Sequence, residues 1–147
     1  MSAKNHPIGL ENLVFTKCIV EAIPKHVPEN GEIIVSPSNH INIDRDDETG
    51  LKWTAMMRTV VNPERDTKWP YHIEMECMAF LTSDGSLDEV SAHRGIAITA
   101  HSVLFGAIRE TVMWLTGRQP YGPLMLGLSV LAPGPVNSKE TQAPTKE

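Results

Sequence analysis

Residues 103–118 read VLFGAIRETVMWLTGR, residues 119–126 continue as QPYGPLML, and this stretch decides the fold. Its large apolar side chains recur at spacings of four, four and three residues, the period of one face of an α-helix. They are Leu104, Ile108, Val112 and Leu115. Gly117 comes next and is predicted to occupy the C′ position of the helix, where φ is positive. We therefore predict a helix, a hook rich in Pro and Gly, and a short strand-like apolar run.

The helix is predicted to have an earlier start. Ser86 is followed three residues later by Glu89, the spacing of a capping box, which predicts that a helix begins there. Gly95 is expected to break or bend this helix, because glycine is a poor helix former. The main helix is therefore placed over residues 98–116.

Three segments before the helix have the pattern of β-strands. They are residues 40–44, 51–61 and 71–80; apolar and polar residues alternate in them, most strictly in the last. Polar turns join them, which predicts an antiparallel meander. Residues 14–23 are apolar on both alternate faces and are predicted to form a strand covered on both sides. One sheet and one long helix place the chain in the α+β class.

The domain organisation follows from composition. A chain of 147 residues suits one domain. We expect a flexible N-terminus over residues 1–12, a folded domain over 13–131 and a disordered, Pro-rich polar tail over 132–147. The connection over residues 24–37 is broken by prolines and carries the apolar run Ile33-Ile34-Val35, which is either a short edge strand or a binding loop.

Charge and composition exclude several classes of function. The net charge is −5 and the 13 Lys and Arg residues are dispersed, so no nucleic-acid partner is expected. The N-terminus lacks the apolar region of a signal peptide, and no apolar run approaches the roughly 20 residues of a membrane span. We expect a cytoplasmic protein without membrane insertion, in which Cys18 and Cys77 are buried free thiols.

No pattern of catalytic or metal-binding residues is present. The six histidines lack ligand spacing; His93 and His101, for example, are eight residues apart. Glu74 and Glu76 share one face of a strand, which suits acid–base catalysis only in a cleft and otherwise indicates a solvated face or an interface. We expect no enzyme activity, no metal and no cofactor. The seven methionines are either core filler or part of a surface that accepts varied apolar partners.

Several segments, in order along the chain, resemble the SecB family of protein-export chaperones. Residues 15–24, FTKCIVEAIP, are similar to the first strand of that family, and the proline-rich loop stands where the family has its crossover loop. The meander follows. Residues 104–110, LFGAIRE, and the hook up to residue 126 are similar to the family's long helix and the segment after it. The resemblance covers about residues 13–130.

This resemblance implies a four-stranded antiparallel sheet whose first strand crosses over to pair with the last, and one long helix packed on one face. It implies a homo-oligomer, either a tetramer built as a dimer of dimers or a dimer. Such proteins hold unfolded or nascent polypeptides without ATP and deliver preproteins for Sec-dependent export to the translocase motor SecA.

We assign three sets of site residues on this basis. The expected client-binding residues are Ile33, Ile34, Val35, Trp53, Tyr71, Ile73, Met75 and Cys77. The expected oligomer interface consists of Leu104, Ile108, Val112 and Leu115. The expected acidic docking face for SecA consists of Glu21, Glu74 and Glu76.

The chain also departs from the family pattern. Residues 106–110 read GAIRE where the family has Pro-Tyr-Ala-Arg-Glu, and Cys18 stands where the family has an acid. Residues 128–135 lead into a polar tail where the family has a second helix. These departures favour an alternative, a dedicated chaperone or adaptor for one partner in a toxin–antitoxin or phage setting, without SecA delivery. A small enzyme with an enclosed polar pocket is a second alternative.

Overall fold

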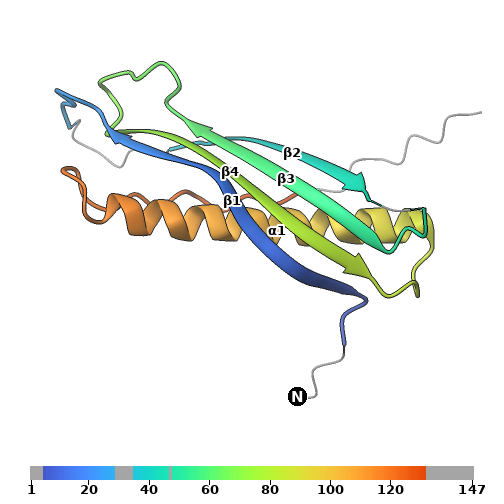
Figure 1. Ribbon diagram of the computed structural model, residues 1–147. Helices are drawn as coiled ribbons and strands as arrows, with labels where there is room; N and C mark the ends of the chain where they lie inside the picture. The colour runs from blue at the N-terminus through green and yellow to red at the C-terminus, as the bar shows by residue number, and fades with distance from the viewer. Residues whose placement is uncertain (1–4, 29–34, 47, 132–147) are drawn as a thin grey trace, which may run out of the picture.

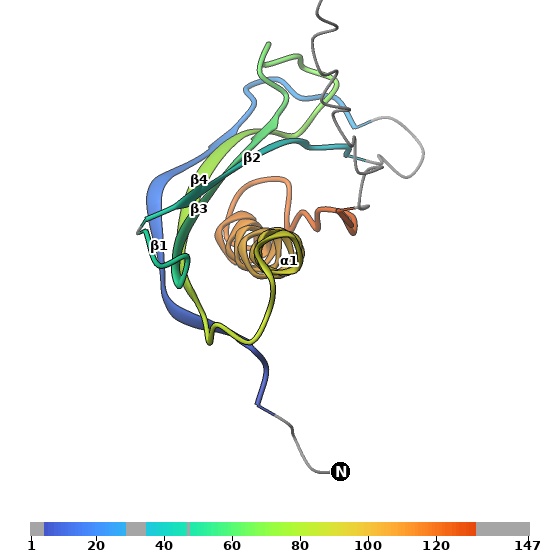
Figure 2. The ribbon, with the colours of Figure 1, turned by 90° about the vertical axis from the view of Figure 1, so that its right-hand side faces the viewer.

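The computed structural model describes residues 5–28, 35–46 and 48–131. Within these residues the elements are β1 (Ile8–Ala22), β2 (Ser38–Arg45), β3 (Lys52–Val61), β4 (Tyr71–Ser83) and α1 (Glu89–Thr116). The strands form one antiparallel sheet in the order β1-β4-β3-β2, and α1 lies along one of its faces (Figures 1 and 2). The predicted α+β fold, with a first strand that crosses over to pair with the last, is confirmed.

Strand β1 is longer than the sequence pattern predicts. It begins at Ile8, which pairs with Ser83, so the expectation of a flexible N-terminus is wrong for residues 8–12. The register shifts between Leu10 and Asn12 and again between Phe15 and Lys17. Each such bulge inserts one residue and interrupts the alternation of faces, and this hid the true start of the strand. Because α1 covers only one face, the expected cover on both sides is also wrong within one chain.

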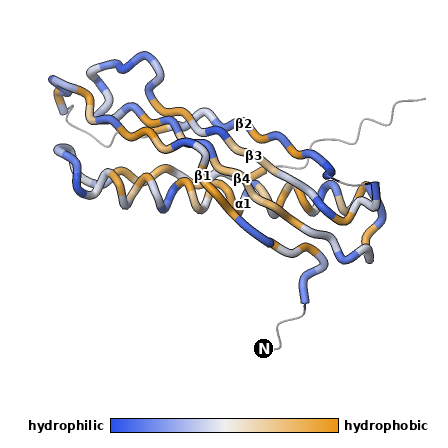
Figure 3. Tube along the Cα trace, in the orientation of Figure 1, coloured by the Kyte–Doolittle hydropathy of each residue, from blue (hydrophilic) through white to orange (hydrophobic). Residues whose placement is uncertain are grey.

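The core lies between α1 and the sheet face that it covers. Alternate residues of β4 from Tyr71 to Leu81 are no more than 1% exposed, and they meet a helix face that is equally buried. That helix face includes Ile96, Ala100, Leu104, Ile108 and Val112. Apolar residues follow both elements, whereas most of the turns are hydrophilic (Figure 3). By length and composition α1 could cross a membrane, and nine of its residues are buried in the domain.

Both ends of α1 differ from the prediction. Asp88, not Ser86, caps the N-terminus, and its Oδ1 accepts a hydrogen bond from the Ser91 amide at 3.0 Å. Ser86 instead closes a local turn by donating its amide to Asp84. Gly117 ends the helix with φ of −59°, so the predicted positive φ is wrong at this position and occurs at Gly122.

Gly95 does not break the helix. A Cβ atom at this position would lie 2.6 Å from Cδ1 of Ile8, closer than real contacts allow. The absence of a side chain therefore lets α1 approach the start of β1, and the helix continues through all 28 of its residues.

The hook after α1 is tied to the end of β1. The Tyr121 hydroxyl donates to the Ile23 carbonyl at 2.6 Å, and the Gln119 amide group donates to the Val20 carbonyl. The Tyr71 hydroxyl donates to the Gly122 carbonyl at 2.6 Å. These bonds fix where the chain turns back along the helix.

Residues 123–131 then run back beside α1 as an extended segment. The Leu124 amide donates to Oγ1 of Thr116, and Oγ of Ser129 lies 3.2 Å from Nε2 of His101, about four helical turns before Thr116. Leu126, between them, is fully buried. The predicted strand-like run is extended, but within the described residues it pairs with no strand.

Candidate functional site

Four of the eight expected client-binding residues are not available to a client. Tyr71, Ile73, Met75 and Cys77 point toward α1 and are at most 1% exposed, and Trp53 is 4% exposed. This assignment is wrong for the four residues of β4, because the more apolar face of the strands is the face that the helix covers. Trp53 lines a cavity that is described below. Val35 is 7% exposed but lines two cavities that are described below, and Ile33 and Ile34 lie outside the described residues.

The surroundings of Trp53 and of the two cysteines are also defined by the structure. The Trp53 indole donates to the Gly50 carbonyl at 2.9 Å and meets the His93 ring edge-on. Burial raises the pKa of the Cys77 thiol to about 11. Cys77 and Cys18 are both free thiols, as predicted, but Cys18 is exposed rather than buried.

The expected oligomer interface is also wrong for three of its four residues. Leu104, Ile108 and Val112 are fully buried against the chain's own sheet. A side chain without exposed surface cannot contact a second copy of the chain. Leu115 is half-buried at the flank of the same stripe. The stripe is therefore core.

A cavity lies at each end of the outer edge of β2. Strand β2 pairs only with β3, so the N–H and C=O groups of its other edge are free of strand partners within the described residues. The extended segment 123–131 faces the start of this edge and makes no backbone-to-backbone hydrogen bond within that part of the chain. We call the space along this edge the β2 groove.

Two cavities mark the β2 groove. The first, of about 310 Å³, lies between the start of β2 and the extended segment. It is lined by Val35, Ser36, Pro37, Asn39, Gly127, Leu128 and Ser129. The second, of about 450 Å³, lies between the end of β2 and the start of α1. It is lined by Ile43, Asp44, Arg45, Trp53, Glu89, Val90 and His93.

Exposed apolar side chains lie on the extended segment beside the first cavity, and Leu128 lines it. Leu128 is 85% exposed, Val130 is 86% exposed and Met125 is 66% exposed, while the residues between them hold the segment on the helix. Soluble proteins scatter single exposed apolar residues over their surface, but three on one short extended segment indicate a place of contact. No sequence pattern joins this segment to β2, because the two are brought together only by the hook.

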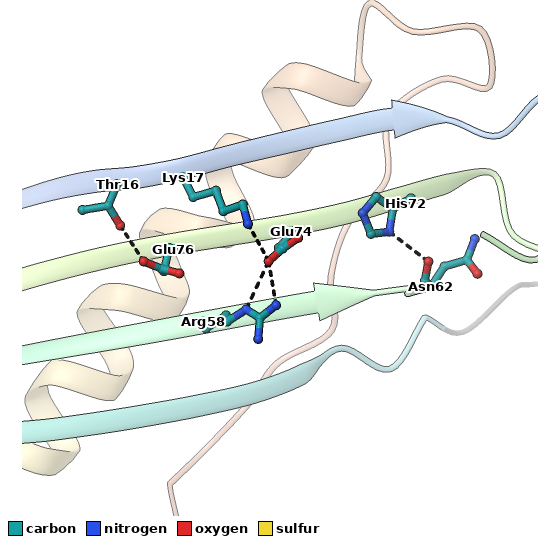
Figure 4. Close-up of polar contacts among 7 residues, drawn as sticks. All are labelled: Thr16, Lys17, Arg58, Asn62, His72, Glu74 and Glu76. Carbon is teal, nitrogen blue, oxygen red and sulfur yellow. Dashed lines mark hydrogen bonds and ion pairs between the residues drawn. The ribbon is translucent and has the colours of Figure 1, made fainter. Parts of the chain in front are cut away.

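The three predicted docking acids are partnered within the chain. On the helix-free face of the sheet, Oε1 of Glu74 lies 2.9 Å from Nζ of Lys17 and 2.6 Å from the Arg58 guanidinium (Figure 4). Hydrogen bonds from Lys17 and then Arg58 lower the pKa of Glu74 to about 2. Its side chain is only 15% exposed.

The other two acids are matched in a similar way. Glu76 accepts a hydrogen bond from the Thr16 hydroxyl at 3.0 Å, and Glu21 pairs with Arg65 at 2.9 Å. The prediction that this face is acidic is therefore wrong. The positive charges of Lys17 and Arg58 offset that of Glu74, and Arg65 offsets that of Glu21.

The same helix-free face carries an apolar row that the prediction missed. Val14, Met78 and Met56 are directly paired across β1, β4 and β3. Val14 is 37% exposed and the two methionines are half-buried. The signal was present in the sequence, since Met78 alternates in step with Glu74 and Glu76.

No protein-family model and no curated protein matches the sequence. Among solved structures, the fold is similar to that of the SecB-like chaperone Rv1957 of Mycobacterium tuberculosis, which was solved in complex with a ChAD peptide from the Rv1956 HigA1 antitoxin. The TM-score is 0.56 at 16% sequence identity, over 86% of this chain and 88% of that chain. The chain has a SecB-like fold.

Within the described residues, no three His, Cys, Asp or Glu side chains come together as metal ligands would. His101 is 5% exposed, its ring is stacked on Phe105, and burial lowers its pKa. Its contact with Ser129 gives it a structural role in holding the extended segment.

Proposed function

We propose that this chain is an ATP-independent holdase that binds extended segments of unfolded or nascent polypeptides in the β2 groove. One observation carries the proposal: a free strand edge and an extended segment with exposed apolar side chains face each other across a cavity. A client in extended conformation can add its backbone to the edge of β2. Its alternate side chains then meet Leu128 and Val130.

The energetics suit reversible holding. A client side chain that becomes dry contributes about 1.5–3 kcal/mol, and a main-chain hydrogen bond about 0.5–1.5 kcal/mol. Ordering each residue of the client costs about 1–2 kcal/mol. Because these contributions largely cancel, binding is modest and release needs neither ATP nor a cofactor.

The free edge of β1 supports a homo-oligomer. Strand β1 pairs only with β4, so its other edge is open within the described residues. On the covered side of the sheet, Leu10 is 47% exposed and Phe15 is half-buried, which leaves apolar surface beside that edge. A second copy that pairs edge to edge satisfies both, and we propose a dimer or a tetramer formed from such dimers.

The charge pattern favours a dedicated partner over general preprotein export. Glutamates that already form ion pairs with Lys17, Arg58 and Arg65 attract a basic surface of a motor protein only weakly. The similar chaperone Rv1957 was solved with a peptide from an antitoxin, and a comparable single client is our preferred partner class, in the cytoplasm. We expect SecA binding to be weak and lost in high salt, or absent.

Aggregation of a chemically denatured client, followed by light scattering without ATP, tests the holdase proposal. The protein should suppress scattering, and the double variant Leu128→Ser, Val130→Ser should lose most of that effect. Val27→Ser is the matched control, because Val27 is 69% exposed but does not line the groove. Equal suppression by the parent and the double variant would refute the site.

Several unrelated denatured clients separate the two forms of the function. A dedicated chaperone protects few of them, whereas an export chaperone protects most and binds SecA in calorimetry. Tight SecA binding that persists at 0.5 M salt, a concentration at which the Debye length is roughly 4 Å, would restore the export role.

A further inference from the structure

A third cavity, of about 380 Å³, lies where β3 turns into β4. Val61 and Val35, 4% and 7% exposed, are its most buried lining residues, and the half-buried indole of Trp69 is a third apolar part. Glu64 and Asp66 are the exposed acidic part of its lining. We call this cavity the Trp69 pocket. Apolar surface beside carboxylates is complementary to a long cationic side chain, which has an apolar stem and a charged head.

The turn that carries Glu64 and Asp66 is held by its own hydrogen bonds. The Asn62 side chain accepts from the Asp66 amide at 2.8 Å and donates to the Asp66 carbonyl. The Asn62 carbonyl lies 2.9 Å from Nδ1 of the buried His72. Glu64 and Asp66 therefore lie on a turn whose backbone is fixed by hydrogen bonds.

The cation between these acids in the sequence is directed elsewhere. Arg65 adopts a positive φ of 53°, and its guanidinium makes two hydrogen bonds to Glu21 on β1. Asp66 uses Oδ1 to accept from the Lys68 amide, and within the described residues no ion pair is formed by either Asp66 or Glu64. Two negative charges thus line the Trp69 pocket without a cation of the chain's own among its lining residues.

The Trp69 pocket and the β2 groove are contiguous. Val35 and Ser36 line both the pocket and the first cavity of the groove. A polypeptide that lies along the start of β2 can therefore place a nearby side chain into the pocket.

We propose that the Trp69 pocket is a subsite for a Lys or Arg side chain of the bound polypeptide. The inference rests on the proposed function and adds a selectivity to it. The aliphatic stem lies on Val61 and Val35, and the charged head meets Glu64 and Asp66, with the indole of Trp69 beside it. An acidic side chain is repelled there, and a purely apolar one covers the carboxylates without replacing their water.

Three synthetic peptides test the inference. They share one extended apolar sequence and differ at one position, which is Arg, its neutral isostere citrulline, or Glu. By calorimetry at low salt, the Arg peptide should bind the parent about fivefold more tightly than the citrulline peptide, the range of an exposed ion pair with a cation–π contact. The Glu peptide should bind most weakly, and 0.5 M salt should reduce the difference.

Matched variants locate the effect. The double variant Glu64→Gln, Asp66→Asn keeps the turn's hydrogen bonding and should bring the Arg and citrulline affinities together while the citrulline affinity stays unchanged. The control Glu48→Gln, Glu110→Gln removes the same charge at two exposed positions that do not line the pocket, and should keep the preference. Trp69→Leu should lower it about twofold.

The possible outcomes distinguish a failure of the pocket assignment from a failure of the holdase proposal. Equal binding of the Arg and citrulline peptides by the parent overturns the pocket assignment and leaves the holdase proposal standing. An equal loss of preference in the double variant and its control also overturns it, since the effect would then be one of net charge. Failure of every peptide to bind overturns both.

Discussion

Replacing Ile108 by alanine tests whether the apolar stripe of α1 is core or interface. Ile108 is fully buried within one chain and packs against β4, as do Leu104 and Val112 on either side of it. The substitution removes three carbon atoms and leaves a cavity, because a packed core relaxes only partly. Such changes cost about 2–5 kcal/mol, and complete burial places Ile108 near the middle of that range, at about 3 kcal/mol.

The assay is urea unfolding followed by tryptophan fluorescence. With a slope of about 1–3 kcal/mol per molar urea, a loss of about 3 kcal/mol moves the midpoint down by about 1–3 M without changing the slope. Leu128→Ala is the control, because a side chain that is 85% exposed should change stability by less than about 0.5 kcal/mol.

Oligomerisation must be separated from folding in this experiment. A core residue destabilises each chain to the same extent at every protein concentration, whereas an interface residue changes the concentration dependence of unfolding. If Ile108→Ala shifts the dissociation of the oligomer and costs less than 1 kcal/mol in the folding of a chain, the packing described above is wrong.

Three further predictions use the same measurement. Gly95→Ala should destabilise by about 1 kcal/mol, because overpacking against β1 outweighs the gain in helix propensity, whereas Gly106→Ala, where nothing lies within 4 Å of the added Cβ, should stabilise by up to about 1 kcal/mol. Asp88→Ala should cost about 1 kcal/mol and Ser86→Ala almost nothing, since only the former caps α1. The pKa of Glu74 is lower in the folded chain than its ordinary value of 4.5, so its contribution is present above pH 4.5 and is lost as the pH falls toward 2; Glu74→Gln should flatten that part of the stability profile.

Local periodicity was enough to predict most of the fold. The alternation in β3 and β4 and the helical stripe through Leu104 each identify the face of the element that is buried. Such a pattern can be recognised without knowing which element packs on that face. The start of β1 was missed where bulges shift the register. The capping box failed because Asp88 offers its carboxylate two residues after the serine and competes successfully for the same helix end.

The candidate site was harder to predict for a physical reason. Alternation marks Tyr71 and Ile73 as part of the apolar face of β4 but does not say whether the chain's own helix or a client covers that face. They are predicted to bind a client but belong to the core. The β2 groove joins residues 35–39 to residues 127–129, which are distant in sequence and share no pattern. Only the hook, through bonds such as that from Tyr121 to Ile23, brings them together.

The pairing of β1 with β4 has a consequence for synthesis on the ribosome. Ile8 bonds across to Ser83, and the remaining registered pairs of these two strands are also far apart in sequence, so β1 emerges long before its partner exists. The first strand must stay unpaired until nearly the whole sheet has been translated. A topology dominated by distant contacts folds slowly, in milliseconds to seconds for small domains. A chain stopped at residue 70 lacks β4 entirely, and β1 and β3 then have no strand between them to join them into a sheet.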